Sequence, residues 1–363
     1  MPNIPVASWI QTVRDRFPGL AGKPAAAEAV SRLLCDIGDH RWTLAQIDKL
    51  PGTLTLTSDV FQIPKPALND EGAAKFASFA AASGFVAPRA RLSLRGCGVV
   101  IRFIQFPRMK PEELRQALQF EAEKYIPFKA SEVLLDHFVL PPRGAPGTPS
   151  KDLDILLVAI KRDEIYPLLN FFRTARLPVE IVDLNALALL NALSVLCPET
   201  QAQTVGVLDI GSAVSTLAIA SQGSAAFIRD ISFGELDLAK RLKLMLGLSE
   251  DKIAELMRST EPLSPEAAAA IKEAFKGLES DLKISLNYFS EQIHAPLPVS
   301  GIYLAGGWSH QAVAEILTQT LGIEVKLLDL TGKVVLRGGL PAGNIARQRG
   351  YLPVLAGLAV RRP

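Results

Sequence analysis

The chain has 363 residues, of which 48% are hydrophobic and 21% charged, and its formal net charge is +2 at pH 7. This composition excludes a disordered chain and, with no long run of one charge, indicates no nucleic-acid-binding surface. The three cysteines have neither metal-ligand spacing nor the even number of a disulfide framework, which indicates a reducing cytoplasm.

The N-terminal segment, 1–28, is predicted to form an amphipathic helix and an arm. Apolar residues recur there at helical spacing, with Arg14 and Arg16 beside them. Such a helix either packs on its own domain or docks on a membrane or a partner. A membrane-spanning helix needs about 20 apolar residues, and the most apolar helical stretch, 184–196, is shorter and contains Asn185 and Asn191.

A motif repeated in the two halves of the chain is the most informative feature of the sequence. Asp36-Ile37-Gly38 and Asp209-Ile210-Gly211 each follow an apolar run, and four variable residues separate each copy from Thr-Leu-Ala. Six matches over ten residues in one register predict a single β-turn-β unit that is used twice. Two such units facing each other would form a nucleotide clamp, with both aspartates beside one cleft.

Between the two copies, the pattern predicts alternating helices and strands. Helices are expected over 71–83, 111–125, 163–176 and 184–196. Strands are expected over 90–106, 133–140, 153–160 and 179–183. The stretch 141–149 is too rich in Pro and Gly for a regular element and is predicted to be a hairpin tip.

After the second copy, the sequence predicts a lobe with several helices. Helices are expected over 235–246, 249–258, 265–293 and 309–321. The long helix, 265–293, has apolar residues in steps of three and four, which is typical of an amphipathic helix. A strand over 302–305 ends at Gly306-Gly307, and an apolar segment, 352–360, is expected to pack on the first lobe.

The second turn has the composition of a phosphate site. Glycine lets backbone amides approach a phosphate, and an aspartate can sit near a phosphate-bound Mg²⁺ through water. The candidate nucleotide-binding residues of the second copy are Asp209, Gly211, Ser212, Ser215 and Thr216. Gly306-Gly307, between a strand and a helix, suits close contact with a flat ligand or a phosphate. A simple hairpin explains the turn equally well.

The first turn is less suited to phosphate. Its candidates are Asp36 and Gly38, but the turn continues with Asp39, His40, Arg41 and Trp42. An acid would repel phosphate, and tryptophan is bulky. No Walker A, Gly-x-Gly-x-x-Gly or Gly-x-Ser-x-Gly pattern occurs, and the histidines lack metal-ligand spacing. We therefore predict no catalytic residue and no metal ligand set.

Several segments resemble the type IV pilus assembly protein PilM family of the actin-like ATPase superfamily. Glu121–Phe128 resembles the family segment E-A-E-x-Y-I-P-F, and Ser285–Phe289 is similar to S-L-D-F-Y. Leu304–Gly307 looks like the adenine-side glycine turn, and Gly357–Arg361 resembles G-L-A-L-R. A looser match, Ala254–Arg258, resembles A-E-x-x-K, which implies Glu255 at the ribose and Arg258 near the base.

The resemblance implies an α/β, two-lobed actin-like fold with repeated mixed-sheet subdomains and an extra α+β subdomain in lobe one. The expected parts are the N-terminal helix and arm at 1–28, a first lobe at 29–200 with its inserted subdomain at about 64–162, a second lobe at 201–345, and a C-terminal segment at 346–363 that returns to lobe one. The family usually follows D-I-G with several serines and a lysine, which this first turn lacks.

The resemblance further implies a cytoplasmic scaffold of a type IV pilus or related type II secretion machine, peripheral at the inner membrane. Its partner would be the cytoplasmic tail of a PilN-like inner-membrane protein, lying beside the extra subdomain, with other machine components and a homo-oligomer or ring left open. ATP with Mg²⁺ is the cofactor the family implies, although the first turn is degenerate. The alternatives are an active ATPase or sugar-kinase-like enzyme and a filament-forming protein.

Overall fold

The computed structural model describes residues 31–50, 53–96, 98–141, 151–259, 262–292, 297–330, 332–337 and 349–361. The predicted N-terminal helix and the predicted hairpin tip after Pro141 lie outside these residues. Among the helices of these ranges, none is long and apolar enough to cross a membrane.

Seven of the described strands form the sheet of the first lobe. They are β1 (Arg32–Ile37), β2 (Arg41–Leu50), β3 (Thr53–Leu56), β4 (Phe61–Pro64), β5 (Ala90–Leu94), β9 (Val179–Leu184) and β15 (Val334–Leu336). Their order is β15-β3-β2-β1-β5-β9, with β4 on β2. The β1–β2 hairpin is antiparallel, whereas β5 runs parallel to β1 and β9 runs parallel to β5.

Five strands form the sheet of the second lobe and repeat this plan. They are β10 (Thr204–Ile210), β11 (Ser215–Ser221), β12 (Ser224–Ile231), β13 (Val299–Gly306) and β14 (Val325–Leu327). The β10–β11 hairpin is antiparallel and β13 runs parallel to β10. The hairpin registers match, because Asp36 pairs with Thr43 as Asp209 pairs with Thr216. The predicted repeat, one β-turn-β unit in each of two sheets, is confirmed.

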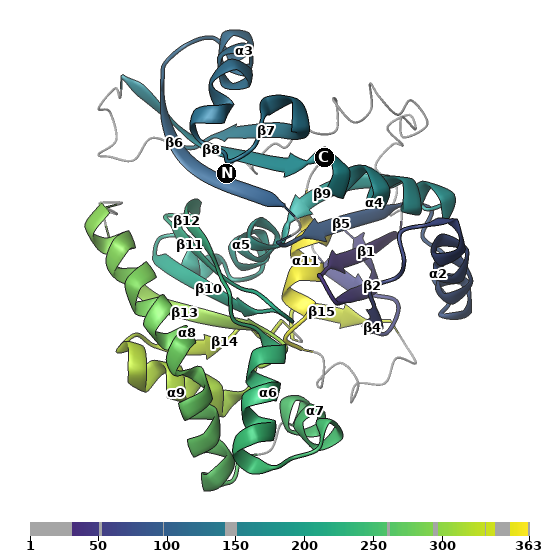
Figure 1. Ribbon diagram of the computed structural model, residues 1–363, viewed down its shortest axis with the longest axis vertical. Helices are drawn as coiled ribbons and strands as arrows, with labels where there is room; N and C mark the ends of the chain where they lie inside the picture. The colour runs from purple at the N-terminus through teal and green to yellow at the C-terminus, as the bar shows by residue number, and fades with distance from the viewer. Residues whose placement is uncertain are drawn as a thin grey trace.

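Helices cover both sheets. Lobe one has α2 (Asp70–Ala82), α4 (Arg162–Thr174), α5 (Asn185–Leu196) and α11 (Leu352–Val360). Lobe two has α6 (Glu235–Leu246), α7 (Glu250–Arg258), α8 (Pro265–Gln292) and α9 (Gln311–Leu321). Figure 1 shows α5 and α11 side by side near the middle of the molecule, and α5 also contacts β11 and β12. As predicted, the apolar helix α5 is buried. Helix α11 contacts α5, β1 and β2.

A three-stranded sheet forms the extra subdomain, drawn at the top of Figure 1. Its order is β6 (Val99–Pro107), β8 (Asp152–Lys161) and β7 (Val133–Val139), and α3 (Pro111–Glu121) packs on it. The subdomain is narrower than the predicted range 64–162, because α2 and β5 belong to the main body of lobe one. Likewise, β15 pairs with β3, so the chain returns to lobe one before residue 346.

Two local predictions differ from the structure. The stretch 90–106 is not one strand, because it breaks between β5 and β6, where Gly96 and Gly98 have φ angles of +61° and +66°. Trp42 does not crowd the first turn. Its side chain is buried in the core, with its ring centroid 5.4 Å from Phe171 and 5.6 Å from Phe172.

Candidate functional site

The carboxyl ends of the parallel strands meet between the lobes, which is where open α/β sheets bind ligands. The two D-I-G turns face each other there, since a Cβ at Gly38 would lie 3.9 Å from the hydroxyl oxygen of Ser212. The sequence predicted this juxtaposition of Asp36 and Asp209. It did not predict what lies between them.

The side chain of Arg95 lies between the two aspartates. Its Nη2 atom donates a hydrogen bond to Asp36 Oδ2 at 2.8 Å, and its Nη1 atom lies 2.7 Å from Asp209 Oδ2. The relative exposures of Asp36, Arg95 and Asp209 are 5%, 9% and 1%, so the guanidinium is withdrawn from water. One buried arginine therefore joins the repeated aspartates of the two lobes by charge.

The register of the sheets explains why Arg95 reaches this point. Leu94 pairs with Ile37 in lobe one, just as Gly306 pairs with Ile210 in lobe two. Arg95 therefore occupies in lobe one the position that Gly307 occupies in lobe two. The sequence holds a signal for the position of Arg95, because this arginine stands directly between the buried strand β5 and the Gly96-x-Gly98 turn.

Asn185, the first residue of α5, completes this cluster. In the orientation of its side-chain amide that satisfies both atoms, the nitrogen donates a hydrogen bond to Asp209 Oδ2 at 3.0 Å. The oxygen then accepts one from Arg95 Nη2 at 2.7 Å. Burial alone lowers the pKa of Arg95, but the charges of Asp209 and Asp36 outweigh it and raise that pKa. Burial raises the pKa of the Asp209 carboxyl, against the opposing charge of Arg95. Arg95 therefore stays charged in the cluster.

A second set of contacts joins the lobes beside the first. Arg41 Nη1 of β2 lies 3.7 Å from Glu235 Oε2 at the start of α6, and it donates to Gln62 Oε1 at 3.1 Å. The hydroxyl of Tyr351 donates to Glu235 Oε1 at 3.0 Å. Burial raises the pKa of Glu235, and the charge of Arg41 opposes that rise. Sequence reasoning missed Glu235 and Tyr351, which carry no motif.

The predicted phosphate donors of the second lobe have partners within the protein. Ser215 donates to the carbonyl of Phe233 at 2.7 Å, and Thr216 donates to Asp230 Oδ1 at 2.7 Å. These two hydroxyls therefore join β11 to β12 and to the residues that follow it. Of the predicted donors, Ser212 is the one that faces the first turn.

The Gly306-Gly307 turn packs on the second D-I-G turn rather than facing open space. Gly306 N donates to the carbonyl of Gly350 at 2.8 Å, and Gly307 N donates to that of Ile210 at 3.1 Å. A Cβ at Gly307 would lie 2.1 Å from Glu235 Oε1 and 2.4 Å from the Tyr351 hydroxyl oxygen. Both glycines are thus required by contacts that the protein makes with itself.

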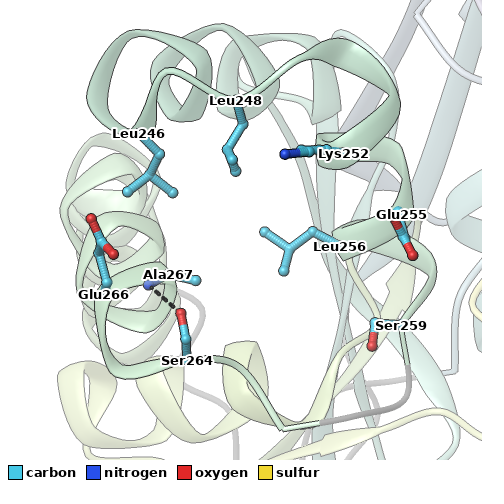
Figure 2. A pocket seen from close by; sticks show the side chains of 9 residues that line it. All are labelled: Leu246, Leu248, Lys252, Glu255, Leu256, Ser259, Ser264, Glu266 and Ala267. Atoms are coloured by element: carbon cyan, nitrogen blue, oxygen red, sulfur yellow. Dashed lines mark hydrogen bonds between the residues drawn. The ribbon is translucent and has the colours of Figure 1, made fainter.

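Glu255 lies apart from the two turns. It lines a cavity of about 440 Å³ between the end of α6, α7 and the start of α8, and none of the lining residues belongs to a D-I-G turn. Figure 2 shows Leu248, Lys252 and Leu256 around this opening, with Glu255 on the α7 side. The side chain of Arg258 lies outside the described residues.

ATP with Mg²⁺ does not fit between the turns as they stand. A Cβ at Gly211 would lie 2.0 Å from Arg95 Nη1, so the guanidinium rests directly on the glycine that a phosphate would approach. The amides that open α6 donate to the carbonyls of Gly211 and Ser212, at 2.8 and 3.0 Å. A phosphate would therefore meet a guanidinium that two carboxylates already neutralise.

The model of the family described as type IV pilus assembly protein PilM matches residues 78–363 of this chain. Among solved structures, a PilM–PilN type IV pilus biogenesis complex is similar over 93% of this chain and 100% of the other, with 23% identity and a TM-score of 0.76. The ethanolamine utilization protein EutJ from Carboxydothermus hydrogenoformans is similar over 98% and 99%, with 14% identity and a TM-score of 0.52. These two likenesses establish the actin-like architecture.

Proposed function

This chain belongs to the family of type IV pilus assembly protein PilM, and from that premise we propose that it is a scaffold of a type IV pilus or related secretion machine. Its proposed task is to dock the cytoplasmic tail of a PilN-like inner-membrane protein, which would hold it at the inner membrane from the cytoplasmic side. A solved relative of the same fold is a PilM–PilN complex, which supports this partner.

The Arg95 bridge is the observation that favours a scaffold over an enzyme. An active ATPase or sugar-kinase-like enzyme needs room for phosphates between its two turns, and here a buried guanidinium takes that room. The nucleotide contacts expected from the sequence stay a prediction, and those of the second D-I-G turn require Arg95 to leave that turn first.

The three-stranded sheet offers an edge for an extended tail. In the described residues β6 and β7 are its outer strands, and β6 lies beside β12 of the second lobe. The outer edge of β7 is therefore the more accessible one. Leu135 and His137 are half-buried there and Val139 is 40% exposed. A tail that added a strand to β7 would gain main-chain hydrogen bonds and bury apolar side chains.

We expect Val139→Asp to weaken tail binding at least about tenfold, because a charge would face the apolar side of the docked strand and each tenfold is about 1.4 kcal/mol. Titration of a labelled PilN-like tail peptide measures the change. Val86→Asp is the matched control, since Val86 is an exposed valine of lobe one outside β7. Equal affinities for both variants would move the docking site away from β7.

Membrane attachment is expected to depend on this partner. The purified protein should stay behind when bare anionic vesicles are floated, and it should float with vesicles that carry the PilN-like partner. Flotation with bare vesicles would contradict the proposal and assign attachment to the amphipathic segment 1–28.

A steady ATP turnover that the variant Asp209→Asn abolishes would instead favour the alternative function, an active ATPase or sugar-kinase-like enzyme.

A further inference from the structure

We propose that Arg95 is a built-in substitute for the Mg²⁺ ion of a bound Mg-nucleotide, and that it closes the cleft between the lobes without nucleotide. The interlobe latch is defined here as Asp36, Arg95, Asn185 and Asp209. This inference does not rest on the proposed docking function, because it concerns the cleft and holds for any partner of lobe one.

The charges require a cation at this place. Asp36 and Asp209 come from different lobes, and both carboxylates are buried where water does not screen them. Two such aspartates beside a phosphate site would share a metal ion or repel each other. The guanidinium of Arg95 supplies the positive charge with one nitrogen for each lobe, at 2.8 Å from Asp36 and 2.7 Å from Asp209.

The backbone around Arg95 is fitted to this role. Gly96 has a φ of +61°, which lets the chain turn away sharply after β5 while the side chain of Arg95 points across the cleft. On the far side, Gly211 leaves a hollow that Arg95 Nη1 fills. A glycine that would serve a phosphate in an active enzyme here serves an arginine of the same chain.

Arg95 is held too firmly to serve as a mobile phosphate-binding residue. If it swung out with no metal ion to take its place, Asp36 and Asp209 would be left buried without a countercharge, which is strongly unfavourable. A second set of contacts lies beside the latch and would have to open as well. In it, Glu235 contacts Arg41 and Tyr351, and Arg41 contacts Gln62. The cleft is therefore closed by the folded chain itself.

The distance between the lobes tests the latch. Spin labels at Val86 of lobe one and Leu244 of lobe two, both exposed, report it by double electron–electron resonance. We expect one narrow distance distribution that millimolar Mg-ATP leaves unchanged, and no heat of ATP binding by calorimetry. A shift or narrowing with Mg-ATP, or micromolar ATP binding, would overturn the proposal.

Asp209→Asn is the variant of choice, because it removes the ion pair between Arg95 and lobe two and leaves Arg95 paired with Asp36 in lobe one. We expect a folded protein, judged by circular dichroism, whose interlobe distance distribution is broader than that of the wild type. Asp281→Asn is the matched control, since it removes a surface carboxylate that pairs with Arg229 within lobe two. A distribution as narrow in Asp209→Asn as in Asp281→Asn would show that the latch does not hold the lobes.

Discussion

Replacing Arg95 with methionine is expected to lower the free energy of unfolding by roughly 3–5 kcal/mol at pH 7, the usual cost of leaving buried charges unpaired. Methionine keeps much of the volume of the side chain but carries no charge. Asp36 and Asp209 would then face each other across the cleft, with Asn185 as their remaining polar neighbour in the latch. Urea denaturation of the variant and the wild type measures the difference.

Arg229→Met is the control for this substitution. Arg229 also forms an ion pair with an aspartate, Asp281, at 3.7 Å, but both side chains are over a third exposed. Exposed pairs are worth about 0–1 kcal/mol, so the control should be close to the wild type. If both variants lost the same small amount, Arg95 would not be neutralising buried charge.

Acidification is expected to restore part of the stability that Arg95→Met loses. Burial already raises the pKa of Asp209, and removing Arg95 removes the charge that opposes this rise. A carboxyl whose pKa is higher in the folded than in the unfolded state binds its proton preferentially when folded. The free energy of unfolding of Arg95→Met therefore increases, relative to that of the wild type, as the pH falls from 7 toward about 5.

Denaturation curves of both proteins across this pH range test the acid effect. The deficit of Arg95→Met relative to the wild type should shrink as the pH falls, and the double variant Arg95→Met/Asp209→Asn should depend less on pH. If the difference in free energy of unfolding between Arg95→Met and the wild type stayed constant or grew as the pH fell, unpaired carboxylates would not be the cause of the loss.

Gly357→Ala is expected to destabilise the protein by about 1–3 kcal/mol or more, as overpacking of a close contact does. Gly357 lies in α11, where it meets α5 backbone to backbone. A Cβ there would lie 1.8 Å from the carbonyl oxygen of Ala188 and 2.5 Å from its carbon. Backbone atoms cannot turn aside, so α11 would have to move off α5. Thermal and urea denaturation measure the loss.

Gly277→Ala is the matched control, because Gly277 is also a helical glycine. It lies in α8, where a Cβ would meet only Arg241, at 3.8 Å, an ordinary contact. Alanine is the better helix former by about 0.5–1 kcal/mol, so this variant should gain stability. A loss in both variants would mean that the helix contact at Gly357 is not the cause.

The packing of α11 gives a physical reason for the sequence Gly357–Arg361. Arg91 Nη1 donates to the carbonyls of Leu358, Ala359 and Arg361 at 3.0, 3.2 and 2.9 Å, and so satisfies the end of the helix. Arg361 Nε lies 3.4 Å from Asp183 Oδ2 at the carboxyl end of β9. This segment joins the C-terminal part of the chain to the first lobe through its backbone.

Local pattern alone was enough to predict most elements of this protein. The apolar stripe of α8 and the all-apolar α5 determine which helix faces are buried, because burial follows the helical period. The repeated D-I-G hairpin predicted two lobes, since six matching residues of ten led to the same strand pairing in each. Where a glycine allowed an unusual backbone angle, as at Gly96, the alternation of apolar residues misled, and one predicted strand proved to be two.

The site itself was decided by tertiary structure. Asp36, Arg95, Asn185 and Asp209 are far apart in the chain, and they meet because parallel strands from both lobes end at one cleft. The sequence identified glycines and hydroxyls suited to a phosphate, but it could not show that Gly211 receives a guanidinium or that Ser215 and Thr216 bond to Phe233 and Asp230. Which partner a polar group finds depends on long-range packing, and short-range pattern carries no information about it.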